Sequence, residues 1–348
     1  MQTIAIFQRD FQIGGIQKAL LNLLQNIDYS RCTVDLYYFD SSPVYPLPER
    51  EGLRYYSLRP FPYLSRFVPF SLLLGKHLPT QEKTYDLAVD FNSYSAECAV
   101  GALTVKAKKR VMWIHNDMRI KYDDEKKYRV LWHFFKDKFH RFDAFAAVSG
   151  GIIPGFRAMT GLSEVPVTAV PNCIDTGEIF RKAEEATTLH VDDGVYNLCS
   201  MGRLVHQKGF DLLLTAFARV KETRQDIHLY LIGDGPERSA LEEQIGKLRL
   251  EESVTLLGNL PNPFPALQQM DGFALTSRYE GQGIVLWEAR ALGLELFMAK
   301  HLEQYNPGLL GYDDIVPPIC AAQRKEKRRD DLSAYNADAL NAFYSLLP

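Results

Sequence analysis

The sequence has few of the features that mark disulfide-bonded, metal-binding or membrane-spanning proteins. It has five cysteines, an odd number, with no Cys-x-x-Cys pair, which predicts free thiols in a reducing cytosol. No uninterrupted apolar run approaches the roughly 18 residues of a membrane-spanning helix. The first residues, MQTIAIFQRDFQ, lack a charged leader ahead of an apolar core, so no signal peptide is expected. No Asp-x-Asp motif falls at a predicted strand end, so no metal site is expected.

What the chain does have is the composition of an ordinary globular protein. Of its 348 residues, 46% are hydrophobic and 24% are charged, and 40 basic against 43 acidic residues leave a net charge of -3. This balance argues against a nucleic-acid-binding protein. The length predicts two domains.

Short apolar stretches alternate with helical periodicity along the chain. TIAIF (3–7) precedes a loop with Gly14-Gly15 and then an amphipathic run, which predicts strand, glycine loop and helix. The alternation predicts two doubly wound α/β domains, each with a parallel sheet covered on both faces. We expect a first domain at 1–172, a charged linker at 173–194, a second domain at 195–322, and a helical tail at 323–348 that crosses back to the first domain. The predicted strands lie at 3–7, 34–39, 85–91, 109–115, 144–149, 167–172, 195–204, 228–235, 253–258 and 271–277.

The first polar motif is GRLVHQKG (202–209), at the end of a predicted strand, where ligands of open parallel sheets bind. Gly202 and Arg203 follow the strand, and Lys208 precedes a helix. Two cations at the mouth of a cleft suit a diphosphate, because Arg203 can fork onto two oxygens while Lys208 acts as a point charge. Two solvated surface cations would show the same spacing.

The second motif, EGQGIVLWE (280–288), holds two glutamates eight positions apart. Gly281 and Gly283 permit close approach to backbone amides at a helix N-terminus, which favours an anion. Glu280 lies in the loop and Glu288 about one turn into the helix, so both can face one groove and accept hydroxyls from a sugar or a ribose. The alternative is that Glu288 only favours the helix dipole and Gly283 only starts the helix.

Three further positions are weaker candidates. Gly15 opens the first helix in half of a phosphate-type loop, and a plain tight turn fits the same residues. Gly233, in GDGP, predicts mainly a turn whose backbone could line a nucleotide base. His115 ends a strand in WIHND and could hydrogen-bond a ligand across the cleft, although a lone histidine is more often structural.

In these segments the sequence resembles the retaining glycosyltransferases of family 4, which have the GT-B fold. The resemblance includes the early Gly-Gly before a helix, His115 after a strand, VPNCID (170–175), GRLVHQKGFDLLLTAF, LIGDGPERSALE, VTLLGNLPN and DGFALTSRYEGQGIVLWEARALG. The last of these contains that family's Glu-x7-Glu signature, and the ordered series covers most of the chain. The resemblance implies two Rossmann-like domains that face a central cleft.

The resemblance also implies roles for the candidate residues. Arg203 and Lys208 would hold the donor diphosphate and stabilise the charge that develops on it. Glu280 and His115 would contact the donor sugar, and Glu288 would bind the ribose hydroxyls. The remaining donor-binding positions would be Gly15, Gly202, Gly233, Gln282, Gly283 and Ile284, with the amides around Gln282-Gly283 on the diphosphate or sugar. No cofactor is implied beyond a nucleotide-diphosphate sugar as co-substrate, and the two cations would replace a metal.

The sequence departs from that family at two places. The stretch GLELFMAKHLEQYNPG (293–308) has Glu295-Leu296 where Pro-Val is usual, which predicts an altered last strand and loop. Gln282 stands where the family often has Phe, which predicts a reshaped sugar pocket. The implied catalytic residues are intact, which favours an active enzyme over a non-catalytic protein of this fold that binds a glycan or a partner enzyme. A sugar-nucleotide epimerase or a phosphorylase is a further alternative.

The implied reaction moves a hexose-type sugar, with retention, from a nucleotide-diphosphate sugar to a saccharide or lipid-linked saccharide in capsule or lipopolysaccharide assembly. UDP is favoured over GDP. Segments 59–79 and 121–142 mix aromatic residues with cations, and residues 101–142 hold 12 Lys or Arg against 5 Asp or Glu. Such segments lie well on anionic lipid, so we expect a cytoplasmic protein that contacts the inner face of the cell membrane. Core aromatics with solvated lysines would give the same composition.

Overall fold

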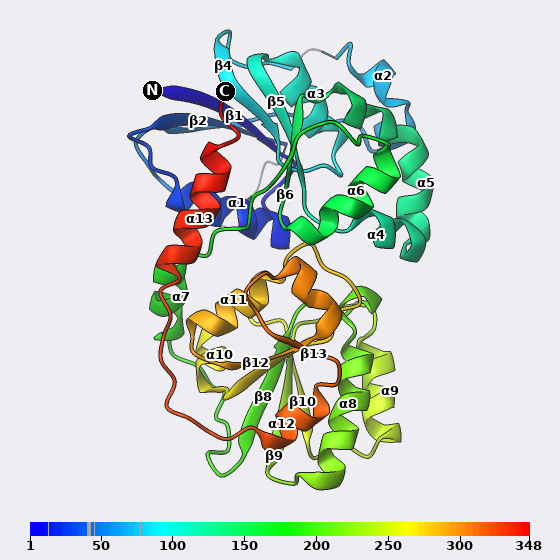
Figure 1. Cartoon of the computed structure of the whole chain (residues 1–348), viewed down its shortest axis with the longest axis vertical. Coiled ribbons are helices and arrows are strands. Elements are labelled where there is room, and N and C mark those ends of the chain that lie inside the picture. Colours follow the sequence, from blue (N-terminus) through cyan, green and yellow to red (C-terminus); the bar gives the residue numbers. More distant parts are fainter. Residues whose placement is uncertain (13, 40–42, 45, 77) are drawn as a thin grey trace. The chain divides into compact units, whose positions relative to one another are not determined.

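The computed structural model describes residues 1–12, 14–39, 43–44, 46–76 and 78–348, which form two compact α/β units (Figure 1). Unit 1 comprises Met1–Cys173 and Ser333–Pro348, and unit 2 comprises Ile174–Leu332. The predicted pair of Rossmann-like domains is therefore confirmed. The units divide the chain differently from the predicted boundaries. Residues 174–194 of the predicted linker join unit 2 because they contain a helix, and the predicted tail is shared between the units.

Unit 1 is built on a parallel sheet with the strand order β3-β2-β1-β4-β5-β6-β7. The central strands carry apolar runs where helices cover both faces of the sheet, and residues 4–7 of β1 are fully buried. The strand β3, with the sequence LRYYS, was not predicted because it is short and mostly polar or aromatic. The strands are β1 (Gln2–Gln8), β2 (Cys32–Tyr38), β3 (Leu53–Ser57), β4 (Thr84–Asp90), β5 (Lys106–Ile114), β6 (Ala144–Ala147) and β7 (Val167–Ala169).

The C-terminal helix α13 (Ser333–Tyr344) packs beside α1 (Gly15–Asn26) and belongs to unit 1, as predicted (Figure 1). Its Phe343 side chain is fully buried. The Tyr344 hydroxyl accepts a hydrogen bond from the Asp28 amide at 2.8 Å, and the Tyr335 hydroxyl donates to the Asn172 carbonyl at 3.0 Å. The other helices of unit 1 are η1 (Tyr63–Phe67), α2 (Phe70–Leu73), α3 (Ala96–Thr104), α4 (Met118–Asp124), α5 (Lys126–Phe135), η2 (Lys136–Arg141), η3 (Gly150–Ile152) and α6 (Ile153–Thr160).

Unit 2 is built on a second parallel sheet, with the order β10-β9-β8-β11-β12-β13. The stretch with the unusual Glu295-Leu296 still forms a strand, since Glu295–Ala299 is β12 and pairs with both β11 and β13. The Glu295 side chain lies near the strand start, where the Tyr196 hydroxyl donates to it at 3.3 Å. The strands are β8 (Tyr196–Met201), β9 (Ile227–Ile232), β10 (Val254–Gly258), β11 (Gly272–Leu275), β12 (Glu295–Ala299) and β13 (Gly311–Tyr312).

The helices of unit 2 cover the sheet with apolar faces, as α8 does with Leu213, Leu214 and Phe217. The helix α7 begins at an aspartate cap, because the Asp175 side chain accepts from the Glu178 amide. In the described part of the chain, no helix has the length and apolar character needed to cross a membrane. The helices are α7 (Thr176–Ala183), η4 (His206–Lys208), α8 (Phe210–Thr223), α9 (Arg238–Lys247), α10 (Phe264–Gln269), α11 (Ile284–Ala291), η5 (Lys300–Tyr305) and α12 (Val316–Ala321).

Candidate functional site

Two loops at the carboxyl ends of β8 and β11 meet in unit 2 and carry the predicted charged residues. The Lys208 ammonium lies 2.7 Å from Oε1 of Glu280. The same oxygen accepts a hydrogen bond from the Ser277 hydroxyl, also at 2.7 Å. Glu280 is only 4% exposed, so both donors help to offset the cost of burying its charge. The first and second sequence motifs therefore form one charged cluster.

The two loops are also joined through their backbones. The Gln207 side chain donates to the Tyr279 carbonyl at 3.0 Å, and the Arg278 amide donates to the Gln207 carbonyl at 2.8 Å. Gly209 has a φ of +63°, and a Cβ placed there would lie 2.2 Å from the carbonyl oxygen of Thr276. Only glycine allows this approach without strain. The position of Lys208 relative to Glu280 is therefore set by backbone as well as by charge.

A forked ion pair ties the second loop to the start of α8. Arg278 donates from both terminal nitrogens to the Asp211 carboxylate, at 2.8 and 2.6 Å. A third bond runs from Arg278 to the His206 carbonyl at 2.7 Å. The hydrogen bonds from Arg278 lower the pKa of Asp211, so the pair stays charged near neutral pH. Bidentate pairs of this kind fix orientation as well as distance.

The cation Arg203 and the two glycines beside it lie at the same end of the sheet. Arg203 is exposed, and its guanidinium makes no ion pair with any residue that the structure describes. A Cβ at Gly233 would lie 2.0 Å from the Gly202 carbonyl oxygen, so the loops that follow β8 and β9 pack backbone to backbone. Gly233 therefore acts structurally here, as the turn interpretation predicts.

The loop before α11 is held by a residue that the sequence did not single out. The Gly283 amide donates to Oδ1 of Asn306 at 2.9 Å, and the Asn306 side-chain amide donates to the Leu302 carbonyl at 3.1 Å. The Ile284 amide donates to the Gln282 carbonyl at 3.0 Å. The amides expected to face a diphosphate are thus already engaged at Gly283 and Ile284.

The second glutamate of the motif lies one turn inside α11. Glu288 is 1% exposed, and Gln282, in the loop before the helix, is 7% exposed. The apolar residues between the two glutamates, Leu286 and Trp287, are also buried. The apolar part of the motif therefore packs into unit 2.

His115 follows β5 in unit 1 and has a fixed tautomer. Its Nε2 lies 2.7 Å from the carbonyl oxygen of Phe91 and must donate to it. Burial lowers the pKa of His115 to about 4, so the ring is neutral at pH 7 and Nδ1 carries no proton. His115 can therefore accept a hydroxyl hydrogen through Nδ1, and it is not an acid at neutral pH.

Gly15 is the first residue of α1, at the carboxyl end of β1. A Cβ built on Gly15 would meet no atom within 4 Å, so the space in front of this helix start is open. Two residues after Gly15, the Gln17 side chain donates to the Asp10 carboxylate at 2.6 Å. Gly15 and His115 thus share the carboxyl end of the unit 1 sheet, while Lys208, Glu280, Arg203 and Glu288 belong to unit 2.

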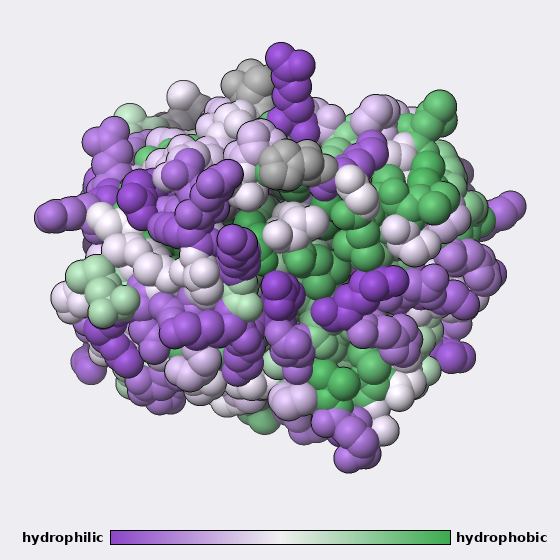
Figure 2. Space-filling view, turned by 90° about the horizontal axis from the view of Figure 1, so that it is seen from above, coloured by the Kyte–Doolittle hydropathy of each residue, from purple (hydrophilic) through white to green (hydrophobic). Residues whose placement is uncertain are grey.

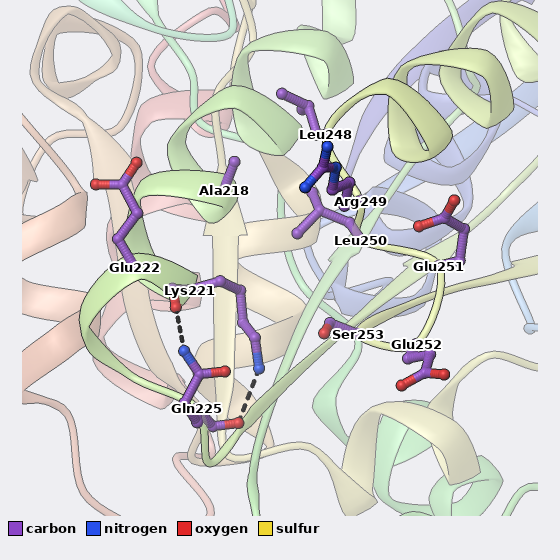
Figure 3. A pocket seen from close by; sticks show the side chains of 10 residues that line it. All are labelled: Ala218, Lys221, Glu222, Gln225, Leu248, Arg249, Leu250, Glu251, Glu252 and Ser253. Atoms are coloured by element: carbon purple, nitrogen blue, oxygen red, sulfur yellow. Dashed lines mark hydrogen bonds between the residues drawn. The ribbon is translucent and has the colours of Figure 1, made fainter.

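Among the described residues, neither a metal site nor a hollow competes with the charged cluster as the candidate site. No group of three His, Cys, Asp or Glu in the described residues is placed to hold a metal ion. A hollow of about 590 Å³ lies between α8 and the turn that leads into β10 (Figure 3). Figure 3 shows Lys221 and Gln225, which are hydrogen-bonded to each other, on one side of this hollow and Glu251 and Glu252 on the other. It lies at the amino ends of β9 and β10, opposite the charged cluster, so we do not assign the site there.

Four functional candidates emerge only from the structure: Ser277, Asp211, Arg278 and Asn306. Arg278 and Asp211 are 67 positions apart, so no spacing rule could pair them. A weak signal existed for Arg278, which lies two residues before Glu280 in the quoted motif. No signal marked Asn306, which lies in the stretch that departs from the family pattern.

Two family models match the chain and together span most of it. One, described as Glycosyltransferase Family 4, matches residues 13–178. The other, described as Glycosyl transferases group 1, matches residues 182–301 and includes the charged cluster. The boundary between the two models falls close to the boundary between the two units.

Relatives with curated names are also glycosyltransferases. A Campylobacter jejuni N-acetylgalactosamine-N,N'-diacetylbacillosaminyl-diphospho-undecaprenol 4-alpha-N-acetylgalactosaminyltransferase is 35% identical over 130 residues, which are 37% of this chain and 34% of that protein. The Rhizobium meliloti lipopolysaccharide core biosynthesis mannosyltransferase LpsB is 30% identical over 214 residues, 58% of this chain and 56% of that protein. The chain spans between 23% and 56% of the length of the curated relatives it matches.

A solved structure matches over almost the whole length. The TarM protein of S. aureus, crystallised as a mutant with fondaparinux, alpha-GlcNAc-glycerol and UDP, superimposes with a TM-score of 0.68. The match covers 99% of both chains at 12% sequence identity. At that identity the likeness concerns the fold alone.

Proposed function

The chain belongs to the family 4 glycosyltransferases of GT-B fold, and from this premise we propose that it transfers a hexose-type sugar, with retention, from a nucleotide-diphosphate sugar to a saccharide or lipid-linked saccharide. The observation that carries the proposal is the cluster of the half-buried Lys208 with the buried Glu280 and Ser277 at the carboxyl ends of β8 and β11. Such a cluster offers a cation to a diphosphate and a carboxylate to sugar hydroxyls.

The residues of the cluster take different roles in this reaction. Arg203, which has no ion-pair partner among the described residues, and Lys208 bind the donor diphosphate and stabilise the charge it gains as its bond to the sugar breaks. Glu280 keeps Lys208 in place and orients the sugar. Because one oxygen of Glu280 already accepts from two donors, a positioning role fits it better than that of a nucleophile.

The unit 1 residues add to the donor site in this proposal. His115 accepts a sugar hydroxyl through its unprotonated Nδ1, and Gly15 leaves room for the diphosphate at the start of α1. Glu288 receives the ribose hydroxyls. The engaged amide of Gly283 changes the expectation for this loop, since it supports the donor site through Asn306 rather than by direct contact. The leaving phosphate takes the acceptor's proton, so the reaction needs no strong protein base and no metal.

The proposals for the nucleotide base of the donor and for the cellular process rest on the relatives and the structural neighbour. TarM was crystallised with UDP, and the printed names of the curated relatives include lipopolysaccharide core enzymes and an undecaprenol-linked acceptor. We therefore propose UDP rather than GDP, and a place in the assembly of surface polysaccharide, inside the cell.

The proposal is tested by binding and turnover in one set of variants. A thermal-shift panel of UDP- and GDP-sugars should raise the melting temperature with a UDP-sugar, because a ligand that binds only the folded state stabilises it. Turnover, measured as UDP release with acceptor and a chelator present, should fall about 10²- to 10³-fold in Lys208→Ala and in Glu280→Gln. The matched control is Lys247→Ala, an exposed lysine on α9.

Each of the other possible outcomes would count against the assigned roles or would indicate one of the alternative functions. Undiminished turnover in both variants contradicts the assigned roles. UDP release without any acceptor that is accompanied by a changed donor sugar indicates an epimerase. The absence of a shift with every nucleotide sugar indicates a non-catalytic glycan- or partner-binding protein of this fold.

A further inference from the structure

Unit 1 carries an exposed apolar patch that the proposed reaction does not use. Its members are Tyr63, Leu64 and Phe67 of η1, Leu72 of α2 and Val130 of α5. Leu64 and Leu72 are 71% and 70% exposed. Of the ten large hydrophobic side chains that are exposed in the described residues, five belong to this patch. Figure 2 shows green side chains gathered on part of a face that is otherwise mostly purple or white, on the side where Figure 1 labels α2 and α5.

The patch is one surface because its elements pack against each other. The Phe67 ring meets the Phe134 ring of α5 edge-on, with centroids 5.9 Å apart. Val130 and Phe134 are one turn apart on α5, and Tyr128 and Trp132 of the same helix are buried toward the core. Patches of this kind on a monomer usually mark an interaction site.

Unpaired cations border the apolar side chains. Lys126 and Lys127 lie one turn before Val130 on the same face of α5, and both are exposed. With Lys136 and Arg141 of η2, they form no ion pair with any residue that the structure describes. The acidic residues before α5 are partly neutralised, since Arg119 pairs with Asp123 and Lys121 with Glu125. The rim of the patch is therefore positive although the whole chain has a net charge of -3.

We propose that this patch docks unit 1 on an anionic bilayer surface, with Leu64, Leu72 and Tyr63 entering the headgroup layer. An apolar centre suits the lipid interface, and the surrounding lysines suit anionic headgroups. A partner protein would have to be acidic around an apolar centre, and a second copy of this chain would set lysines against lysines. Charge complementarity thus favours lipid over self-association. This inference does not depend on the proposed transferase reaction, because vesicle binding requires no donor sugar.

The test is co-sedimentation of the full chain with vesicles of phosphatidylcholine alone and of phosphatidylcholine with phosphatidylglycerol. Binding should require phosphatidylglycerol and weaken as salt rises. Leu64→Glu with Leu72→Glu should reduce binding at least tenfold, because two charges would replace the two most exposed apolar side chains of the patch. Lys126→Gln with Lys127→Gln should reduce it about fivefold for each lysine removed.

Matched controls separate docking from general effects of charge and folding. Leu310→Glu changes a leucine of unit 2 that is 62% exposed, and Lys247→Gln with Lys325→Gln removes the same net charge as the lysine pair; both should bind as the parent chain does. All variants should keep the parent's melting temperature, since the changed side chains lie in water. Equal binding to both vesicle types, binding unchanged in the leucine pair, or a dimer in light scattering that Leu72→Glu dissociates would overturn the proposal.

Discussion

At the scale of single residues, a local hydrogen bond fixes the tautomer of His115, and burial keeps its ring neutral. Its Nε2 hydrogen is committed to the Phe91 carbonyl, and burial lowers its pKa from 6.5 to about 4. The unfolded chain therefore takes up a proton between pH 6.5 and 4 that the folded chain does not bind. By linkage, this residue makes the fold less stable as the pH falls through that window.

His115→Gln should remove that part of the pH dependence. Between pH 8 and pH 5, the free energy of unfolding of the variant should fall by about 2 kcal/mol less than that of the parent chain. Urea unfolding at both pH values measures the difference, with His140→Gln, an exposed histidine of unit 1, as control. Asp90, whose pKa burial raises to about 7, acts in the opposite sense but is present in both chains and cancels. An equal fall in the two chains would contradict the buried, neutral ring.

At the scale of elements, a glycine joins two loops that the sequence shows as separate motifs. Gly209→Ala should push η4 away from the Thr276 carbonyl, because its Cβ would lie 2.2 Å from that oxygen and its φ is +63°. We expect a loss of roughly 2–4 kcal/mol from the left-handed conformation and the clash. Turnover should fall more than tenfold as Lys208 shifts from Glu280.

The control for this change is Gly161→Ala. Gly161 has a similar φ of +72°, but a Cβ there meets nothing within 4 Å. It should lose only the roughly 1–2 kcal/mol of the left-handed conformation and keep full turnover, measured by UDP release. Similar turnover in the two variants would show that the approach of Gly209 to Thr276 does not position Lys208.

Some elements of the fold could be predicted from the sequence and others could not. The strands β1, β4, β5 and β8 were predictable because each contains the short apolar run that burial on both faces of a sheet requires. The two-residue β13 was not, since it exists only through pairing with β12. Within the site, the two motifs that contain Lys208 and Glu280 could be found in the sequence, but their direct ion pair could not. The fork from Arg278 to Asp211 and the bond from Gly283 to Asn306 depend on tertiary folding between segments with no common pattern.

At the scale of the whole molecule, unit 1 is completed by the end of the chain. Phe343 of α13 is fully buried, and its ring centroid lies 6.2 Å from that of Trp113 on β5. Arg31 lies over the neighbouring Tyr344 ring at 3.9 Å. The helix therefore closes the hydrophobic core of a unit whose other residues end at Cys173.

Phe343→Ala should destabilise unit 1 selectively. A buried phenylalanine replaced by alanine costs about 3–5 kcal/mol, from lost burial and the cavity left behind. Asn341→Ala, an exposed change on the same helix, should cost little. Scanning calorimetry should show one unfolding transition lowered in Phe343→Ala and the other retained, because α13 belongs to unit 1 and the core cluster of unit 2 consists of residues of that unit. Fluorescence of Trp113 should follow the lowered transition. If both transitions fell equally, the two units would unfold as one, and the division of the chain at Cys173 and Leu332 would have no energetic meaning.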